Sequence, residues 1–214
     1  MRNPWLDISE ADYVGHMSSP AVDQRRVLNA LFRDVLENHR PETVLVVGCS
    51  TGNGLEHVDP AVTARVTALD VNPAFVRRVE ERFSDSGFEL HVRCADVACA
   101  SLEPDAFDLI HAALIFEYVD WVEILPRLVA SLRSGGVLSV VLQRPSSAAP
   151  AVTPTAFTSL LTLHTVFRFV DPDVLVEQAQ HLGMTVITRR TVPLIAEKAF
   201  EAVRFRRRMH GQFP

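Results

Sequence analysis

The chain has 214 residues, of which 48% are hydrophobic and 22% are charged, and its formal net charge is −5. This is enough apolar material for one compact domain, residues 1–214, with its own core. The acidic excess argues against a nucleic-acid surface, which is usually basic, and the near absence of lysine is what a GC-rich genome produces.

We expect a soluble, cytoplasmic protein that contacts no membrane. No segment approaches the roughly 20 apolar residues of a membrane helix, and the first five residues lack a signal-peptide core. The cysteines Cys49, Cys94 and Cys99 are odd in number and form no CxxC or Cys/His pattern, which favours a reduced compartment and predicts no metal site.

The first predicted helix begins after Ser19, which is placed as an N-cap before Pro20 at the first helical position. The helix should end near Asn38, before Pro41. One face of it carries apolar residues at helical spacing: Leu28, Leu31, Phe32 and Val35.

A strand, a glycine-rich turn and a second strand follow. The apolar run 44–47 stops at Gly48, a short helix should begin at Leu55, and a second apolar run, 66–69, ends in the carboxylate of Asp70. Glycines let a backbone approach a ligand at a helix N-terminus, and an acid after the next strand accepts ribose hydroxyls. An adenosine-like cofactor is therefore the first hypothesis.

The glycine spacing argues against a nicotinamide dinucleotide. The dinucleotide fingerprint reads G-x-G-x-x-G, and counting from Gly52 its sixth position here is His57. An NAD(P)-dependent oxidoreductase is therefore the less favoured enzyme.

The next elements alternate between helix and strand. Asn72 before Pro73 predicts a helix over 73–83, and Pro126 should kink or divide a helix over 121–132. The apolar runs predict strands over 89–93, 109–113 and 137–142.

The C-terminal third begins with a proline-rich stretch, 145–154, which predicts a binding loop or lid. Residues 155–169 should form a helix and then an extended stretch, and the helix from 171 to 181 should end at Gly183. Strands are expected over 184–191 and 198–206, and they should pair antiparallel because the connection is too short for a crossover helix.

The motifs, taken together, resemble those of the class I S-adenosylmethionine-dependent methyltransferases. The turn reads G-x-x-x-G-x-G, Asp96 follows the apolar segment 88–92, 107–112 looks like the fourth strand, and 132–138 looks like the helix-turn-strand before strand five. The resemblance covers about 44–143 and continues more loosely to the C-terminus.

This resemblance implies an α/β, doubly wound, seven-stranded and mostly parallel sheet of strand order 3-2-1-4-5-7-6, with strand 7 antiparallel. It divides the single domain into an N-terminal lid and helix (1–40), a cofactor-binding core (41–143), a substrate loop (144–170) and a C-terminal helix and hairpin (171–214).

The resemblance also implies roles in binding S-adenosylmethionine. Asp70 should accept the ribose hydroxyls, and the remaining contacts fall on two sets of residues. The sugar and methionine portion should lie against Gly48, Cys49, Ser50, Gly52, His111 and Ala112, and the adenine against Val71, Asp96 and Val97.

Two positions depart from the family pattern. Val46 stands where the family commonly has an acid that helps to hold the cofactor's ammonium group, and Ser50 replaces the middle glycine. Another acceptor must then serve the ammonium group, and Ser50 fits without a clash if its backbone is ordinary.

The acceptor chemistry has several candidate residues. His111 and Glu117 are candidate general bases after strand four, although Glu117 is also explained as a solvated acid at a helix start. Candidate lid or substrate residues are Tyr13, His16, Tyr118 and His164; an exposed loop explains the first two equally well, and a core or lid role explains the last better than a base role.

We therefore predict a small, bacterial-type enzyme that transfers a methyl group to a small-molecule acceptor mainly by orientation and water exclusion. A catalytically inactive subunit of the same fold, acting as a binding scaffold, is the alternative that Val46 keeps open. The acceptor and the oligomeric state are not determined by the sequence.

Overall fold

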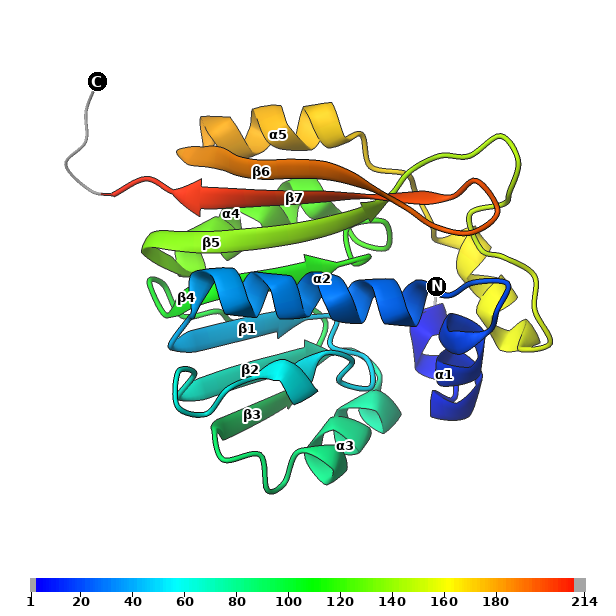
Figure 1. The fold of residues 1–214 in the computed structure, drawn as a ribbon, viewed down its shortest axis with the longest axis horizontal. Helices are drawn as coiled ribbons and strands as arrows, with labels where there is room; N and C mark the ends of the chain where they lie inside the picture. The colour runs from blue at the N-terminus through cyan, green and yellow to red at the C-terminus, as the bar shows by residue number, and fades with distance from the viewer. Residues whose placement is uncertain (1–2, 210–214) are drawn as a thin grey trace.

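A computed structural model describes residues 3–209 of the chain (Figure 1). They form one seven-stranded sheet in the order β3-β2-β1-β4-β5-β7-β6, as predicted. The strands are β1 (Thr43–Val47), β2 (Arg65–Asp70), β3 (Glu89–Cys94), β4 (Phe107–Ala113), β5 (Leu132–Gln143), β6 (Met184–Pro193) and β7 (Ala199–Arg207).

Strands β1 to β5 are parallel, and β7 pairs antiparallel with both β5 and β6. The predicted C-terminal hairpin is therefore confirmed. The helices are α1 (Glu10–Ser18), α2 (Gln24–His39), α3 (Pro73–Arg82), α4 (Trp121–Ser131) and α5 (Pro172–His181), with 3-10 turns η1 (Pro4–Asp7), η2 (Leu55–His57) and η3 (Thr158–Thr165).

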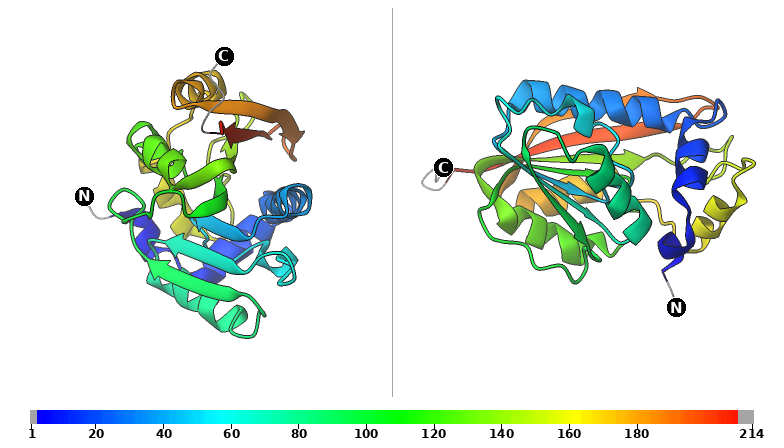
Figure 2. Two further views of the ribbon diagram at one scale, coloured as in Figure 1. Left: turned by 90° about the vertical axis from the view of Figure 1, so that its left-hand side faces the viewer. Right: turned by 90° about the horizontal axis from the view of Figure 1, so that it is seen from below.

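Helices cover both faces of the sheet. Successive side chains of a strand point to opposite sides, so each strand packs against both helical layers. Val44 and Val46 of β1 pack with α2 and α3, whereas Leu45 and Val47 pack with α4 and α5. Figure 2 shows these helices on opposite faces of the twisted sheet. All five residues of β1 are buried, which explains its uninterrupted apolar sequence.

The N-terminal segment differs from the prediction. Helix α1, capped by the Ser9 side chain on the Asp12 amide, was not predicted, and Ser19 ends this helix instead of beginning the next. Pro20 lies in the turn between them, and α2 starts at Gln24 after Asp23, whose φ is 47°. The N-cap pattern at Ser19 was misleading because the local S-P signal does not show which side of it is helical.

Two further elements differ in form. The short helix predicted from Leu55 is a single 3-10 turn. Strand β5 begins at Leu132 and runs through Gly135 and Gly136, with a register shift against β4, so the predicted helix-turn-strand is a helix leading directly into a bulged strand. Pro126 lies within one continuous helix α4.

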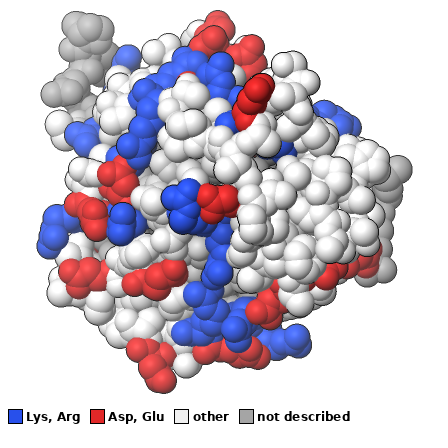
Figure 3. Space-filling model, turned by 45° about the vertical axis from the view of Figure 1, so that its right-hand side comes forward, with Lys and Arg blue, Asp and Glu red and all other residues white. Residues whose placement is uncertain are grey.

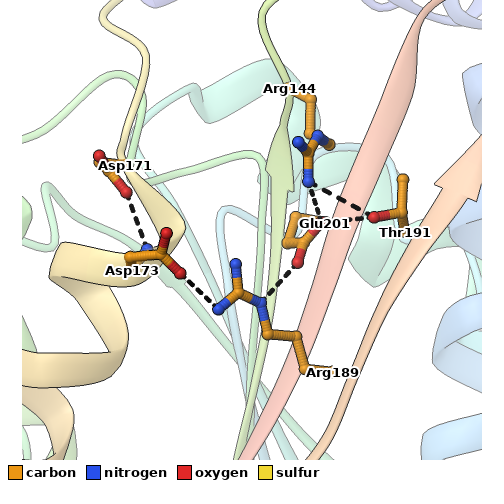
Figure 4. Close-up of polar contacts among 6 residues, drawn as sticks. All are labelled: Arg144, Asp171, Asp173, Arg189, Thr191 and Glu201. Carbon is orange, nitrogen blue, oxygen red and sulfur yellow. Dashed lines mark hydrogen bonds and ion pairs between the residues drawn. The ribbon is translucent and has the colours of Figure 1, made fainter.

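A buried carboxylate ties the C-terminal strands together (Figure 4). Glu201 of β7 accepts hydrogen bonds from Arg189 Nε (2.6 Å), Arg144 (2.8 Å) and Thr191 Oγ1 (2.9 Å), and Arg189 also contacts Asp173 of α5 at 2.6 Å. Since Arg144 follows β5 directly, the network fixes the base of the segment that leaves β5.

Within residues 3–209, no helix combines the length and the apolar character needed to cross a membrane.

Candidate functional site

A crevice lies beyond the carboxyl ends of the parallel strands. Helix α1 and η3 cover this edge of the sheet (Figures 1 and 2). The crevice holds about 1100 Å³ of empty space when its open mouth is included. This is the edge at which open α/β sheets bind ligands.

Asp70, the last residue of β2, lines this crevice and is 8% exposed. Its Oδ2 accepts a hydrogen bond from the Ser50 amide at 2.8 Å, and its Oδ1 accepts one from the Asn72 amide at 2.9 Å. The Val71 amide is a further backbone donor to this carboxylate. Burial raises the pKa of Asp70 to about 6, and the backbone hydrogen bonds oppose this rise.

Ser50 lies in the left-handed region, with φ at 41°. The ordinary backbone that would let a serine fit here without strain is therefore not present. This conformation costs a non-glycine residue roughly 1–3 kcal/mol. The Ser50 side chain hydrogen-bonds Tyr13 of α1, so the serine links the glycine turn to the N-terminal lid, which a glycine could not do.

Asp96 and Val97 lie on the same crevice as Asp70. The Asp96 carboxylate is exposed, and its Oδ1 accepts a hydrogen bond from the Ala98 amide at 2.9 Å. The Ala95 amide donates to the Asp70 carbonyl at 2.9 Å, which keeps the two acid-bearing segments adjacent. The tertiary structure thus brings together the two acids that the sequence singled out.

The predicted cofactor residues divide into two groups. Gly48, Ser50, Asp70, Val71, Asp96 and Val97 line the crevice. Cys49, Gly52, His111 and Ala112 are not among the lining residues; Cys49 is buried in the core on the α2 side, and Ala112 is buried on the α4 side.

Gly52 has φ +77°, and a Cβ there would lie 2.8 Å from Cε2 of Phe83. The glycine is therefore required by its left-handed backbone and by packing against the end of α3.

His111 lies under α2, on the opposite side of β4 from Ile110 and Ala112. Its ring stacks on Phe32 with centroids 4.4 Å apart, and Nδ1 is 3.2 Å from the Ser139 hydroxyl. Burial lowers the pKa of His111 to about 3. The structure gives this histidine a packing position in place of the base or methionine-binding position that we predicted.

Glu117 is 1% exposed, so the reading of a solvated acid at a helix start is wrong. Its Oε1 accepts a hydrogen bond from the Gln143 amide at 2.7 Å, whereas Oε2 has no hydrogen-bond partner among the described residues. Burial raises the pKa of Glu117 to about 7. It stands behind the crevice wall, next to the lining residues Tyr118 and Gln143, and does not itself line the crevice.

The lid is built from the N-terminal segment and η3. Tyr13, His16 and Tyr118 line the crevice, and Trp5 packs edge-on against Tyr118 with centroids 4.9 Å apart. Gly15 of α1 lies directly under the Phe157 ring, where a Cβ would be 2.2 Å from Cζ. Of the two interpretations of Tyr13 and His16, the exposed loop is therefore wrong, because both residues lie on a packed helix at the crevice.

His164 points away from this site. It is exposed at the end of η3, does not line the crevice, and its Nδ1 contacts the Leu161 carbonyl.

The sequence reasoning missed a polar group beside the lid. Gln24 and Gln143 line the crevice, and Lys198 lies behind it, 6% exposed. Gln143 directly follows the predicted strand 137–142, which is a detectable signal, but no local pattern points to Gln24 or Lys198.

Val46 packs under α2 and α3, so no side chain at this position reaches the crevice to hold an ammonium group. The described residues also contain no group of three or more metal-ligating side chains.

Residues 44–136 match the family model described as a methyltransferase domain. Trans-aconitate 2-methyltransferase from Variovorax paradoxus is 36% identical over 104 residues, which are 47% of this chain and 39% of that protein. Malonyl-acyl-carrier-protein O-methyltransferase from a Paenibacillus species is 28% identical over 193 residues, 84% of this chain and 64% of that protein. The chain thus spans less than two thirds of the length of these relatives.

Solved structures share the fold. The N-methyltransferase NodS from Bradyrhizobium japonicum, in complex with S-adenosyl-L-homocysteine, has a TM-score of 0.68 at 18% identity over 96% of this chain and 99% of that one. The cyclase SpnF has a TM-score of 0.68 at 14% identity over 86% of this chain and 83% of that one.

The family match covers the strand, glycine turn and acids of the crevice, and the structural likeness covers the whole sheet with its antiparallel last strand. The central part of this chain is therefore similar to methyltransferase domains, and its fold is that of these solved structures.

Proposed function

We propose that the protein transfers a methyl group from S-adenosylmethionine to a small-molecule acceptor. The observation that carries the proposal is the buried Asp70 carboxylate, which backbone amides hold at the end of β2 and which lines the crevice. A rigid carboxylate at this position matches the acid that accepts ribose hydroxyls in nucleotide-binding sheets.

The remaining lining residues fit the same cofactor. Asp96 and Val97 would contact the adenine edge, and Gly48 and Ser50 the sugar and the methionine portion. When bound, the cofactor supplies an electrophilic methyl group. The chain orients it through Asp70 and the turn, and α1 and η3 exclude water, so that orientation contributes the larger part of the rate enhancement.

A dinucleotide is a poorer fit. Pyrophosphate binds where a glycine turn leads into a helix N-terminus with its dipole. Here the turn leads into the 3-10 turn η2, Leu55–His57, which lacks the length of such a helix.

The scaffold alternative rests on Val46, whose side chain lies in the core. The lid and the crevice favour ligand binding. The names of the relatives support methyl transfer. Of the two relatives described above, trans-aconitate 2-methyltransferase has the higher sequence identity, and its match covers 47% of this chain.

Titration calorimetry of the full chain with S-adenosylmethionine, S-adenosylhomocysteine and NAD tests the proposal. We expect the first two to bind and NAD not to bind. NAD binding would favour an oxidoreductase, and failure of all three would favour the scaffold. Turnover is then checked by following formation of S-adenosylhomocysteine on addition of candidate acceptors.

A further inference from the structure

The part of the crevice away from Asp70 and Asp96 is lined by residues such as Gln24, Gln143, Ala151 and Thr153, and we call it the acceptor end. Its surface carries no formal charge. Among the described lining residues, only Asp70 and Asp96 are formally charged, and both lie at the cofactor end. Residues 145–167, which supply much of the lid, contain no Asp, Glu, Lys or Arg. On the side of the molecule that carries the lid, Figure 3 shows a broad area without charged side chains.

A buried cation lies directly behind this neutral wall. Lys198 Nζ donates to Thr153 Oγ1 at 2.6 Å and to the Ala151 carbonyl at 3.1 Å, and both Thr153 and Ala151 line the crevice. Burial lowers the pKa of the lining residue His16, and the nearby positive charge of Lys198 lowers it further.

Lys198 has no ion-pair partner within the described part of the chain, although it is only 6% exposed. An ammonium group has three N–H donors, and the two acceptors above are both neutral. Burying a charge without an opposite charge is costly, and burial accordingly lowers the pKa of Lys198 to about 8. A carboxylate arriving in the crevice would supply the missing countercharge.

The choice of residue is unusual for this chain. Of 21 lysine and arginine residues, Lys198 is the only lysine. Arginine serves the surface charges and ion pairs, so compositional bias does not explain a lysine at this one buried position. Lysine differs from arginine in presenting a compact point charge with rotatable donors.

Neutral donors surround the same place. Gln143 Nε2 donates to the Ala151 carbonyl at 2.8 Å, Gln24 Nε2 lies 3.4 Å from Gln143 Oε1, and His16 Nδ1 lies 3.0 Å from the Thr155 hydroxyl. Donor groups and one unpaired cation, with no nearby acid on the crevice surface, form a site suited to an anion.

We propose that the acceptor is a small organic acid and that Lys198 binds its carboxylate. Lys198 lies behind the part of the crevice wall that Thr153 and Ala151 form. This inference rests on the proposed function and specifies the class of its substrate. Lys198 acts as an acceptor-binding residue: it fixes the acid relative to the cofactor end of the crevice and takes no part in proton transfer.

The single lysine allows a direct test. Full-length protein labelled with ¹³C at the lysine ε-carbon gives one lysine side-chain resonance. The protein is first saturated with S-adenosylhomocysteine and then titrated with malonate, with tricarballylate and with the uncharged analogue malonamide. We expect both acids to shift the Lys198 resonance saturably and malonamide to leave it unchanged.

Variants separate recognition from folding. Lys198→Met should weaken acid binding about tenfold or more, since a charged hydrogen bond is lost, while the affinity for S-adenosylhomocysteine stays within about twofold. Arg33→Met, on the exposed face of α2, is the control and should change neither. If Lys198→Met does not fold, Lys198→Arg keeps the charge and should still prefer the acids to malonamide.

The outcomes are distinguishable. Failure of S-adenosylhomocysteine to bind sinks the proposed function itself. If it binds, the inference is overturned when neither acid saturates, when malonamide binds as well as malonate, or when Lys198→Met retains the affinity of the unsubstituted protein for the acids.

Discussion

The backbone amide of Ser50 donates a 2.8 Å hydrogen bond to Oδ2 of Asp70, which joins the turn after β1 to the end of β2. The acid is thereby fixed before any ligand arrives, and the left-handed Ser50 is held in place by the residue that it orients. A site pre-organised in this way loses little conformational entropy on binding.

Replacing Asp70 by asparagine should weaken S-adenosylhomocysteine binding about 10- to 100-fold, since one carboxylate oxygen that accepts hydrogen bonds is lost. Because burial raises the pKa of Asp70 to about 6, affinity in the unsubstituted protein should fall as the pH drops below that value. Calorimetry at several pH values measures both effects. Asp85→Asn, at an exposed position, is the control. An unchanged affinity in Asp70→Asn would remove the ribose-binding role.

Replacing Gly52 by alanine should destabilise the fold by about 2–4 kcal/mol, through left-handed strain and a clash with Phe83. Gly183 is a matched control, because its φ is +80° and nothing lies within 4 Å of a Cβ there. Gly183→Ala should therefore show the backbone cost alone. Urea denaturation of the two variants measures the difference, and equal losses would mean that the Phe83 contact is relieved without cost.

Replacing Glu117 by glutamine should raise stability at alkaline pH relative to acidic pH. Burial raises the pKa of Glu117 from 4.5 to about 7, so the folded state binds the proton more tightly and stability declines as the pH rises between these values. The decline is worth about 3 kcal/mol. Denaturation at about pH 5 and about pH 8 should show it in the unsubstituted protein and not in Glu117→Gln. The idea fails if both proteins show the same pH dependence.

His111 should act in the opposite direction. Burial lowers its pKa from 6.5 to about 3. Between these values the unfolded chain binds a proton at His111 and the folded chain does not, so stability is lost as the pH falls below 6.5. His111→Phe removes this dependence while keeping a ring on Phe32. The same denaturation series measures it, with exposed His164→Phe as the control. A bell-shaped activity profile that disappears in His111→Phe would instead restore a catalytic role.

Replacing Glu201 by glutamine should cost about 1–3 kcal/mol, because three donors lose their charged acceptor. Burial favours the protonated acid, but the hydrogen bonds from Arg189, Arg144 and Thr191 outweigh it and lower the pKa of Glu201. Its stabilisation is therefore present above the ordinary pKa of 4.5 and disappears on acidification below it. Thermal unfolding at neutral pH checks the loss, and exposed Glu197→Gln should show none.

The central strands were predictable because short, uninterrupted apolar runs are typical of strands in a parallel sheet that is covered on both faces. Asn72 before Pro73 and Gly183 after His181 marked real helix ends, since capping is a local interaction. Helix α1 was missed because it packs in part against α3 and η3, which lie far from it in sequence.

The candidate site was predicted in part. Asp70 and Asp96 follow neighbouring parallel strands, so the fold brings them to one edge. His111 also ends near that edge, but strand alternation puts it on the face of Leu109 and Phe32. Which alternate residue of a strand faces a crevice depends on the elements that pack there.

The sequence by itself determined the strands, the glycine turn and the acids, because these follow from periodicity and motif spacing within a short stretch of chain; the strand order was what the family resemblance implied. Only the tertiary structure decided that Lys198, 45 residues beyond Thr153 along the chain, stands behind the acceptor end of the crevice. A buried charge acquires its meaning from the groups around it, and those groups come from segments that are distant in sequence.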